Sequence, residues 1–420
     1  MNLITTYISN FLSRSGSYVF LGTIISRCLS FLASWLALQL IPNKVLGVVL
    51  FAYSIIAFLI PFGGLGLHQS LIRYGALLST EEDKNNLFIY VLKKGTMVTF
   101  LIISVIIVFG YVFPFKFENT RYYLTILSFV LIPSFILSII QIQFRLKYNN
   151  KEFSKTDIVY NLILVISILI FSYLYQEKGY IFALIIAPTL TSFFFFKKLN
   201  INFYITKKLK IVNFSFWKYG FYSGITSVVT SLLLIIDILL IGHLMENSEM
   251  VTAYKYVSLI PLSLLFLPRI FINTDFVTFT EKIYDRTYIE QYIKSYMLLF
   301  FLISLVICVF SFFFSKEILS IFSQDFTIYS ESFLILIFGI SGILIFRGLF
   351  GNLLCSIGKI EINSYIMAIA LVLNIFSNFY LIPIYGIKGA AITSAILMWF
   401  TGVFSCVWFL YLYKKMLINE

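Results

Sequence analysis

The chain has 420 residues, of which 60% are apolar and only 12% carry a charge, and its mean hydropathy is +0.95. Soluble domains carry charge on about a quarter of their residues, so this composition excludes an ordinary soluble protein. The 47 Phe and 28 Tyr residues exclude a disordered chain, because so many rings cannot all stay solvated. The net charge of +12 does not indicate a nucleic-acid partner, because the basic residues lie between apolar blocks, where they orient a chain in a bilayer.

Twelve apolar runs follow one another along the chain. A bilayer core of about 30 Å is crossed by about 20 apolar helical residues, and each run is long enough. The runs are continuously apolar, which favours helices over the alternating strands of a barrel. A segment with apolar residues at helical spacing, 1–15, precedes them and is predicted to lie along the membrane surface. The runs cover residues 17–40, 46–66, 95–115, 123–144, 156–175, 179–196, 218–241, 251–273, 294–314, 328–350, 362–382 and 387–412.

The Lys and Arg residues are distributed unevenly over the connections between these runs. Twenty-one lie at the termini or in even-numbered connections, and six lie in odd-numbered ones. Cytoplasmic loops carry the excess of Lys and Arg, so the bias predicts that both termini are cytoplasmic. The predicted outer loops are short, which places function within or between the spans. The six basic residues of these outer loops are Lys44, Lys116, Arg121, Lys178, Lys316 and Lys388.

The longest basic connection, 197–218, lies at the midpoint and divides the chain into 1–205 and 206–420. A weak echo between Asn43–Ser54 and Asn247–Ser258, each a hairpin between the first two spans of a half, supports this division. Two similar halves with a substrate path between them are a known transporter plan. We therefore expect two six-helix lobes around a central cavity.

Polar side chains recur along one face of the first span. Arg27 lies near its middle, and Thr23, Ser30 and Ser34 fall on the same helical face. A charge at the bilayer centre costs about 2.5–3.5 kcal/mol on insertion scales, so we expect Arg27 to face a water-filled cavity. The hydroxyls are candidate cavity-lining groups, and helix packing is the alternative because Ser and Thr join membrane helices.

The seventh span carries a comparable polar face, with Ser227, Thr230 and Asp237. Asp237 and Lys255 lie nine residues on either side of Glu246, which predicts similar depths on neighbouring helices. This placement is equally compatible with a structural ion pair and with coupling to an ion gradient.

Further polar residues lie in the later spans. Arg269 and Arg347 are candidates for substrate contact, although both lie near predicted cytoplasmic ends, where a long side chain can snorkel to the interface. Asn374 and Asn378, one turn apart, are candidates for cavity lining or helix packing. The basic residues Arg27, Lys255, Arg269 and Arg347 outnumber Asp237. This favours an anionic passenger with phosphate oxygens and argues against an exporter of organic cations.

The sequence shows no pattern for a metal, a cofactor or a catalytic nucleophile. The two His residues lie far apart, and none of the four Cys residues is at metal-ligand spacing from another. The near match to a phosphate-binding loop at 351–359 has the wrong glycine spacing. We therefore expect no metal, no cofactor and no catalytic residue. The four Cys residues are Cys28, Cys308, Cys355 and Cys406.

Four segments carry a resemblance to a known family. They are SRCLSF (Ser26–Phe31), GLGLHQSLIRYGA (Gly64–Ala76), DILLIGHLMENSEMVTAYKY (Asp237–Tyr256) and YLIPIYGIKGAAITSAI (Tyr380–Ile396). With these segments and its twelve-span layout, the chain resembles, over essentially its whole length, the polysaccharide flippases. These are the O-antigen and repeat-unit translocases of the multidrug/oligosaccharidyl-lipid/polysaccharide exporter superfamily.

The resemblance implies an alternating two-lobed transporter of the bacterial cytoplasmic (inner) membrane. It would move an undecaprenyl-diphosphate-linked oligosaccharide to the outer leaflet for O-antigen, capsule or lipopolysaccharide biosynthesis, with a polymerase and a ligase as candidate partners. Arg27 matches a first-span arginine that looks like a diphosphate contact in related flippases. Asp237 and Arg73 match recurrent motif positions, whose roles the resemblance leaves open. The first half lacks the carboxylates of the drug-exporting branch, which argues against cation coupling of that type.

Two other functions fit parts of the pattern. An ion-coupled drug or metabolite exporter of the same superfamily would share the architecture, and cation-selective resistance on expression would favour it. A membrane-embedded polysaccharide polymerase or glycosyltransferase would need a large loop with carboxylates outside the membrane. The predicted loops are too short for that.

Overall fold

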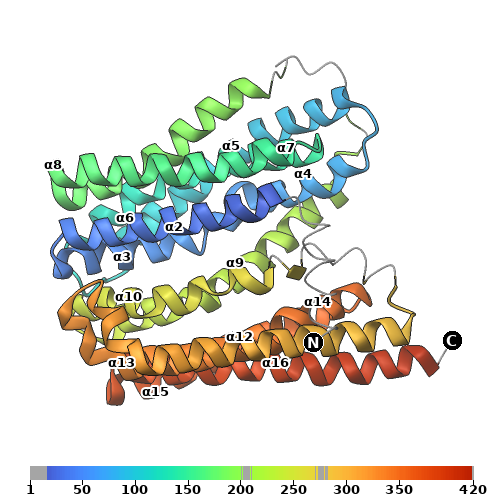
Figure 1. Ribbon diagram of the computed structural model, residues 1–420. Helices are drawn as coiled ribbons and strands as arrows, with labels where there is room; N and C mark the ends of the chain where they lie inside the picture. Colours follow the sequence, from blue (N-terminus) through green and yellow to red (C-terminus); the bar gives the residue numbers. More distant parts are fainter. Residues whose placement is uncertain are drawn as a thin grey trace. The chain divides into compact units, whose positions relative to one another are not determined.

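A computed structural model describes residues 17–199, 201, 209, 211–269, 271–272, 279 and 282–418. Within these residues the chain forms helices joined by turns and no strand, which confirms the all-helical class (Figure 1). The predicted surface helix 1–15 lies outside the described residues, and so does the middle of the predicted linker, at 202–208.

The helices have the following bounds. In the first half they are α2 (Ser17–Leu40), α3 (Asn43–Ala57), η1 (Ile60–Gly66), α4 (Leu67–Ala76), α5 (Glu81–Val112), α6 (Thr120–Ser128), α7 (Leu131–Leu146) and α8 (Asn150–Lys198). In the second half they are α9 (Phe214–Leu244), α10 (Glu249–Ser263), α12 (Arg286–Ser320), η2 (Gln324–Tyr329), α13 (Ser330–Gly342), the π-turn η3 (Ile343–Arg347), α14 (Gly348–Ser356), α15 (Ile360–Tyr385) and α16 (Ile387–Ile418).

Eleven helical segments of the described chain are long and apolar enough to cross a membrane. Ten of the twelve predicted runs correspond to one such segment each, and the runs 156–175 and 179–196 both lie in α8. The chain is therefore a multi-pass membrane protein.

The 49 residues of α8 contain a reversal at Gln176, which has φ 49° and ψ −125°. A Cβ at Gly179 would lie 1.9 Å from the Phe171 carbonyl oxygen. Residues eight apart in a continuous helix are separated by about 12 Å, so the chain turns back here. The fifth and sixth predicted spans are thus the two arms of α8.

The junction of α15 and α16 repeats this local geometry. Gly386 has φ 57° and ψ −135°, and a Cβ at Gly389 would lie 2.3 Å from the Leu381 carbonyl oxygen. The contact again joins residues eight apart, and the glycine again follows a Lys, at Lys388 as at Lys178. The match between the two reversals adds a structural similarity to the sequence echo between the two halves.

Polar caps fix where helices begin on the predicted cytoplasmic side. Thr80, Asn149 and Asp285 each accept a hydrogen bond from the backbone N–H three residues on, at 3.2, 3.1 and 3.0 Å. Each cap satisfies a donor that has no partner within the first turn of a helix. The acidic residues 81–83, in the first turn of α5, also suit the positive end of the helix dipole.

Contacts divide the chain into two compact units. One contains Leu21–Ile235 with Glu246–Thr252, and the other contains Ile236–Met245 with Ala253–Glu420. The first part of α9, up to Ile235, therefore groups with the helices that precede it. The division into lobes 1–205 and 206–420 stays a prediction from the sequence.

Each unit has its own buried core. Phe88, Phe135 and Phe216 are buried together in the first unit, and Tyr296 and Phe350 in the other. Many large apolar side chains are exposed on the long helices, α5 and α12 among them, and a bilayer would cover them. Examples on these two helices are Met97, Val105, Val108, Val112, Val306, Phe312 and Phe313.

Candidate functional site

Asp237, on α9, is a buried carboxylate that accepts four hydrogen bonds from neutral side chains. Its Oδ1 accepts from Asn374 Nδ2 at 3.1 Å and from Asn378 Nδ2 at 2.8 Å. Its Oδ2 accepts from Tyr254 Oη at 2.5 Å and from Ser394 Oγ. The Asp237 side chain is only 4% exposed, and all four donors belong to buried residues. We call these five residues the Asp237 cluster.

Four helices contribute to the Asp237 cluster, whose five residues all belong to one compact unit. Asn374 and Asn378 lie four residues apart on α15, which places both amides on one helical face. Asn378 Nδ2 also donates to Asn374 Oδ1 at 2.9 Å, which orients the pair. Tyr254 comes from α10, and Ser394 comes from α16, shortly after the reversal at Gly386.

Within the described part of the chain, the carboxylate of the Asp237 cluster has no basic partner. An ionised carboxylate offers about four acceptor positions, and four donors fill them. These hydrogen bonds offset part of the cost of removing a charge from water. Two further buried atoms, Asn378 Oδ1 and Thr393 Oγ1, have no hydrogen-bond partner among the described residues. Chemically, the Asp237 carboxylate can be neutralised by a proton or by a bound small cation.

Lys255 does not join the Asp237 cluster. It is half-buried on α10, one residue after Tyr254, and takes part in none of the ion pairs of the described residues. Consecutive residues of a helix point about 100° apart, so only one of the two can face Asp237. The ion pair suggested by the sequence is therefore not formed in this structure, because Tyr254 occupies the position beside the carboxylate.

Arg347 lies at the end of the π-turn η3, within the predicted tenth span. Its guanidinium donates from Nη1 to Ser405 Oγ at 2.6 Å, and Ser405 in turn donates to the Thr401 carbonyl oxygen at 2.7 Å. No carboxylate of the described residues forms an ion pair with Arg347. A π-turn inside a helix often marks a functional position, because it displaces one residue from the regular helical face. Arg347 is thus a half-buried cation held by a neutral hydroxyl.

The polar face of the first span is present on α2. Arg27 is exposed, and Thr23, Ser30 and Ser34 are half-buried. Ser34 Oγ donates to the Ser30 carbonyl oxygen at 3.1 Å, within its own helix. The position of Arg27 on this polar helix is compatible with a cavity role, which stays a prediction.

The hydroxyls of α9 also donate within their own helix. Ser227 Oγ donates to the Ser223 carbonyl oxygen at 3.0 Å, and Thr230 Oγ1 donates to the Thr226 carbonyl oxygen at 2.9 Å. Ser227 is half-buried and Thr230 is exposed. Back-bonding of this kind satisfies the hydroxyls without a ligand, so they can line a cavity or a helix contact equally well.

The two remaining arginine candidates are exposed. Arg269 lies at the end of its apolar segment, where a long side chain can reach the membrane interface. The Arg73 guanidinium lies 4.3 Å from the centre of the Tyr219 ring, and this stacking supports a packing role. Among the described residues no group of three or more His, Cys, Asp or Glu side chains could hold a metal ion.

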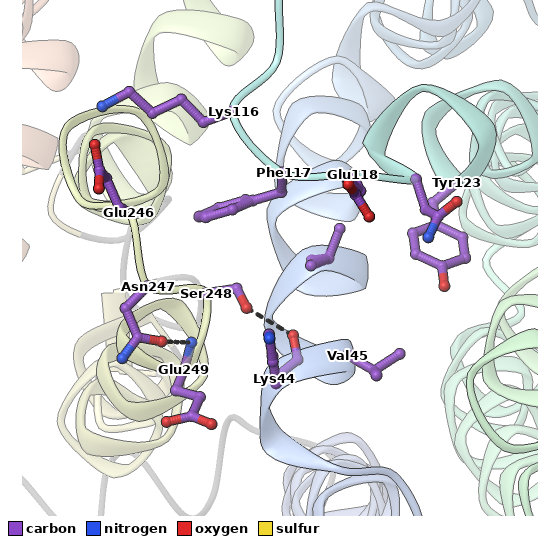
Figure 2. Close-up of a pocket in the computed structure, with 12 residues that line it drawn as sticks. Lys44, Val45, Lys116, Phe117, Glu118, Tyr123, Glu246, Asn247, Ser248 and Glu249 are labelled. Carbon is purple, nitrogen blue, oxygen red and sulfur yellow. Dashed lines mark hydrogen bonds between the residues drawn. The ribbon is translucent and has the colours of Figure 1, made fainter.

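A polar pocket of about 830 Å³ lies where three predicted outer connections meet, within one compact unit (Figure 2). Lys44 comes from the start of α3, residues 116–119 come from the connection before α6, and residues 246–249 form the turn between α9 and α10. The prediction from the Lys and Arg census places all three connections on one side of the membrane. Their convergence in one pocket is consistent with that topology.

Comparison with known proteins identifies the family. Residues 12–269, well over half of the chain, match the family described as Polysaccharide biosynthesis protein. The chain belongs to this family. Residues 223–380 also match the MatE family, so the two matched ranges overlap at 223–269, in the second half of this polysaccharide biosynthesis protein. No curated protein matches the sequence.

Solved structures share the fold of this family member along almost its whole length. An inward-facing multidrug resistance MATE family transporter of the MOP superfamily has a TM-score of 0.71 and 14% identity, with 94% of this chain and 98% of that chain covered. The lipid II flippase MurJ, in an inward closed conformation, has a TM-score of 0.65 and 18% identity, with 96% and 90% covered. A MOP superfamily transporter from Pyrococcus furiosus, described as having a binding pocket of reverse polarity, has a TM-score of 0.60 and 15% identity, with 96% and 95% covered. At these identities the comparisons establish the fold.

Sequence reasoning named Asp237, Asn374 and Asn378 separately and missed Tyr254 and Ser394. Tyr254 is eight residues after Glu246, so the depth argument that selected Lys255 applies to Tyr254 as well. Ser394 lies in a segment that carries the family resemblance, but a single hydroxyl in an apolar helix gives no signal of its own. Ser405, the partner of Arg347, was missed for the same reason.

Proposed function

We propose that this protein is a flippase that moves an undecaprenyl-diphosphate-linked oligosaccharide from the cytoplasmic to the outer leaflet by alternating access. The proposal places it in a bacterial cytoplasmic (inner) membrane, as a step in O-antigen, capsule or other surface polysaccharide biosynthesis. Family membership and the shared fold with transporters, including a lipid II flippase, support this proposal.

The observation that carries the proposal is the half-buried guanidinium of Arg347. It is held by Ser405 and forms no ion pair with a carboxylate of the described residues. Asp237, the buried carboxylate of the seventh span, is satisfied by neutral donors, so it does not cancel this charge. An anionic passenger would supply the missing counter-charge, and guanidinium groups suit phosphate oxygens.

The substrate's chemistry explains why such a protein would be needed. A lipid-linked saccharide carries a charged, hydrated head group past about 30 Å of hydrocarbon, where charge and unsatisfied polar groups are costly. A wet path with cationic side chains would lower that barrier while the polyprenyl tail stays in lipid. In this proposal Arg27, Arg269 and Arg347 contact the diphosphate at different stages of the passage.

The Asp237 cluster is the proposed site of coupling to an ion gradient. A carboxylate held only by neutral donors can accept a proton or a small cation without first breaking an ion pair. The cluster also links α9 to α10, α15 and α16, so a change in its charge would reach four helices at once. Binding at one place could then shift the population of the whole unit.

The test is transport of a fluorescent undecaprenyl-diphosphate oligosaccharide in proteoliposomes that contain the purified protein. We expect Arg27→Ala and Arg347→Ala to abolish transport while the folded yield remains, and Lys at either position to restore only part of it, because the planar fork is lost. Arg286→Ala is the matched control, since this exposed arginine pairs with Glu290 at the start of α12. Full transport by Arg27→Ala and Arg347→Ala would refute the roles proposed for these arginines.

A second candidate is an ion-coupled drug or metabolite exporter. The MatE match over residues 223–380, which contains Asp237, Asn374 and Asn378, favours it. The same proteoliposomes distinguish the two functions, because an exporter would move a fluorescent organic cation and leave the lipid-linked saccharide in place.

A further inference from the structure

Two segments about 200 residues apart in sequence are joined by hydrogen bonds next to the polar pocket. Ser248 Oγ, in the turn between α9 and α10, donates to the Lys44 carbonyl oxygen at 2.8 Å (Figure 2). Thr252 Oγ1, in the first turn of α10, donates to the Asn43 carbonyl oxygen at 2.7 Å. Both acceptors lie in the first turn of α3, and both donor side chains are buried.

The backbones approach closely at Gly47, one turn further along α3. A Cβ there would lie 1.9 Å from the Ser248 carbonyl oxygen and 2.9 Å from Thr252 Oγ1. No larger residue fits without moving one of the two segments. Small residues at such a contact let two helices meet and separate without dragging bulky side chains past each other.

The joined segments are the ones that echo each other in sequence, at the first hairpin of each half. At this contact two hydroxyl hydrogen bonds and a close approach at a glycine join the segments. The two hydrogen bonds are specific but individually weak, because each contributes only about a 2- to 10-fold change in an equilibrium constant.

The pocket beside the contact is lined by charged side chains. Lys44, Lys116, Glu118, Glu246 and Glu249 line it, and none of them takes part in the ion pairs of the described residues. Charges of both signs that stay unpaired in a pocket of about 830 Å³ require water around them. Water is therefore available at the edge of the contact to replace the two hydrogen bonds when it opens.

We propose that the start of α3 and the turn between α9 and α10 form a latch on the predicted outer side of the membrane. The latch is closed in this structure and opens once in each transport cycle, so that the head group of the substrate can leave. This inference rests on the proposed function for its role in transport, but the opening itself is a property of the protein alone.

A reversible cross-link tests the role in transport. In a background with Cys28, Cys308, Cys355 and Cys406 replaced by Ser, the pair Lys44→Cys and Asn247→Cys places one thiol on each side of the latch. A short bis-methanethiosulfonate reagent should reduce transport in proteoliposomes at least 10-fold, and a reductant should restore it. The matched control is Glu246→Cys with Glu249→Cys, where both thiols lie on one side and the cross-link should leave transport intact. Undiminished transport by the cross-linked 44/247 pair would overturn the latch.

A labelling experiment tests the opening without any substrate. Thr252 is fully buried, so Thr252→Cys should react with a membrane-impermeant maleimide only when the latch opens. Adding Ser248→Ala should raise the labelling rate about 2- to 10-fold, because it removes the remaining hydroxyl hydrogen bond. An unchanged rate would overturn the latch. If the uncross-linked protein moves no lipid-linked saccharide, the flippase proposal fails, and this labelling result still decides whether the latch opens.

Discussion

Removal of one donor from the Asp237 cluster should destabilise the protein by a measurable amount. Ser394→Ala deletes a hydroxyl that donates to a carboxylate only 4% exposed. A hydrogen bond to a charged group contributes about 1.5–3 kcal/mol, and Tyr254 stays on the same oxygen, so we expect a loss of about 2 kcal/mol in the free energy of unfolding. The unfolding entropy of 420 residues is about 0.9 kcal/mol/K, so the melting temperature should fall by about 2 °C.

The neighbouring residue provides a matched control for this change. Thr393 Oγ1 is buried and has no hydrogen-bond partner in the part of the chain that the structure describes, so Thr393→Val removes a hydroxyl without removing a hydrogen bond seen there. We expect this variant to be as stable as the wild type or slightly more stable. The assay is thermal unfolding of both purified variants in one detergent, followed by Trp fluorescence. If Ser394→Ala has the melting temperature of the wild type, or if Thr393→Val loses as much stability as Ser394→Ala, the hydrogen bonds of the Asp237 cluster do not stabilise the protein as proposed.

Three further predictions concern the reversals, the coupling site and the π-turn. Gln176→Gly should stabilise the protein by about 1–3 kcal/mol and Gly386→Gln should destabilise it similarly, because both positions have positive φ and only one holds a glycine; equal melting temperatures would contradict this. Asp237→Asn should remove the dependence of transport on an imposed ion gradient, and a dependence that persists would exclude the cluster as the coupling site. Arg347→Lys should lower transport with unchanged folded yield, measured in proteoliposomes, whereas a lower yield would indicate a structural role.

The positions of the membrane-spanning segments could be predicted from the sequence, because the length and the continuous apolar character of each run almost suffice to identify them. Ten runs correspond to one helical segment each, and the other two lie in α8. The reversal at Gln176 lies in the predicted connection between the runs 156–175 and 179–196, but its positive φ could not be foreseen, since glycine is the usual residue at positive φ. The grouping of the first part of α9 with the earlier helices was also not visible, because it depends on tertiary contacts between distant segments.

The sequence predicted individual residues of the candidate site, but not which residues lie together in it. Burial of a charge in an apolar run singles out Asp237 and Arg347, because such a group is costly unless the protein uses it. The partners of these charges could not be predicted, since a single Ser or Tyr in a membrane helix is common. Lys255 shows the limit of depth arguments, because rotation about the helix axis decides which of two adjacent residues reaches a neighbour.

The most direct test of the proposed function is deletion of the gene in its host, followed by extraction of membrane lipids. Surface polysaccharide and undecaprenyl-linked repeat units on the cytoplasmic leaflet are measured together. We expect that surface polymer is lost while completed lipid-linked units accumulate inside the cell. Unchanged polymer and unchanged lipid intermediates would contradict the flippase function and favour a drug or metabolite exporter, and the absence of any completed unit would indicate an enzyme that makes it.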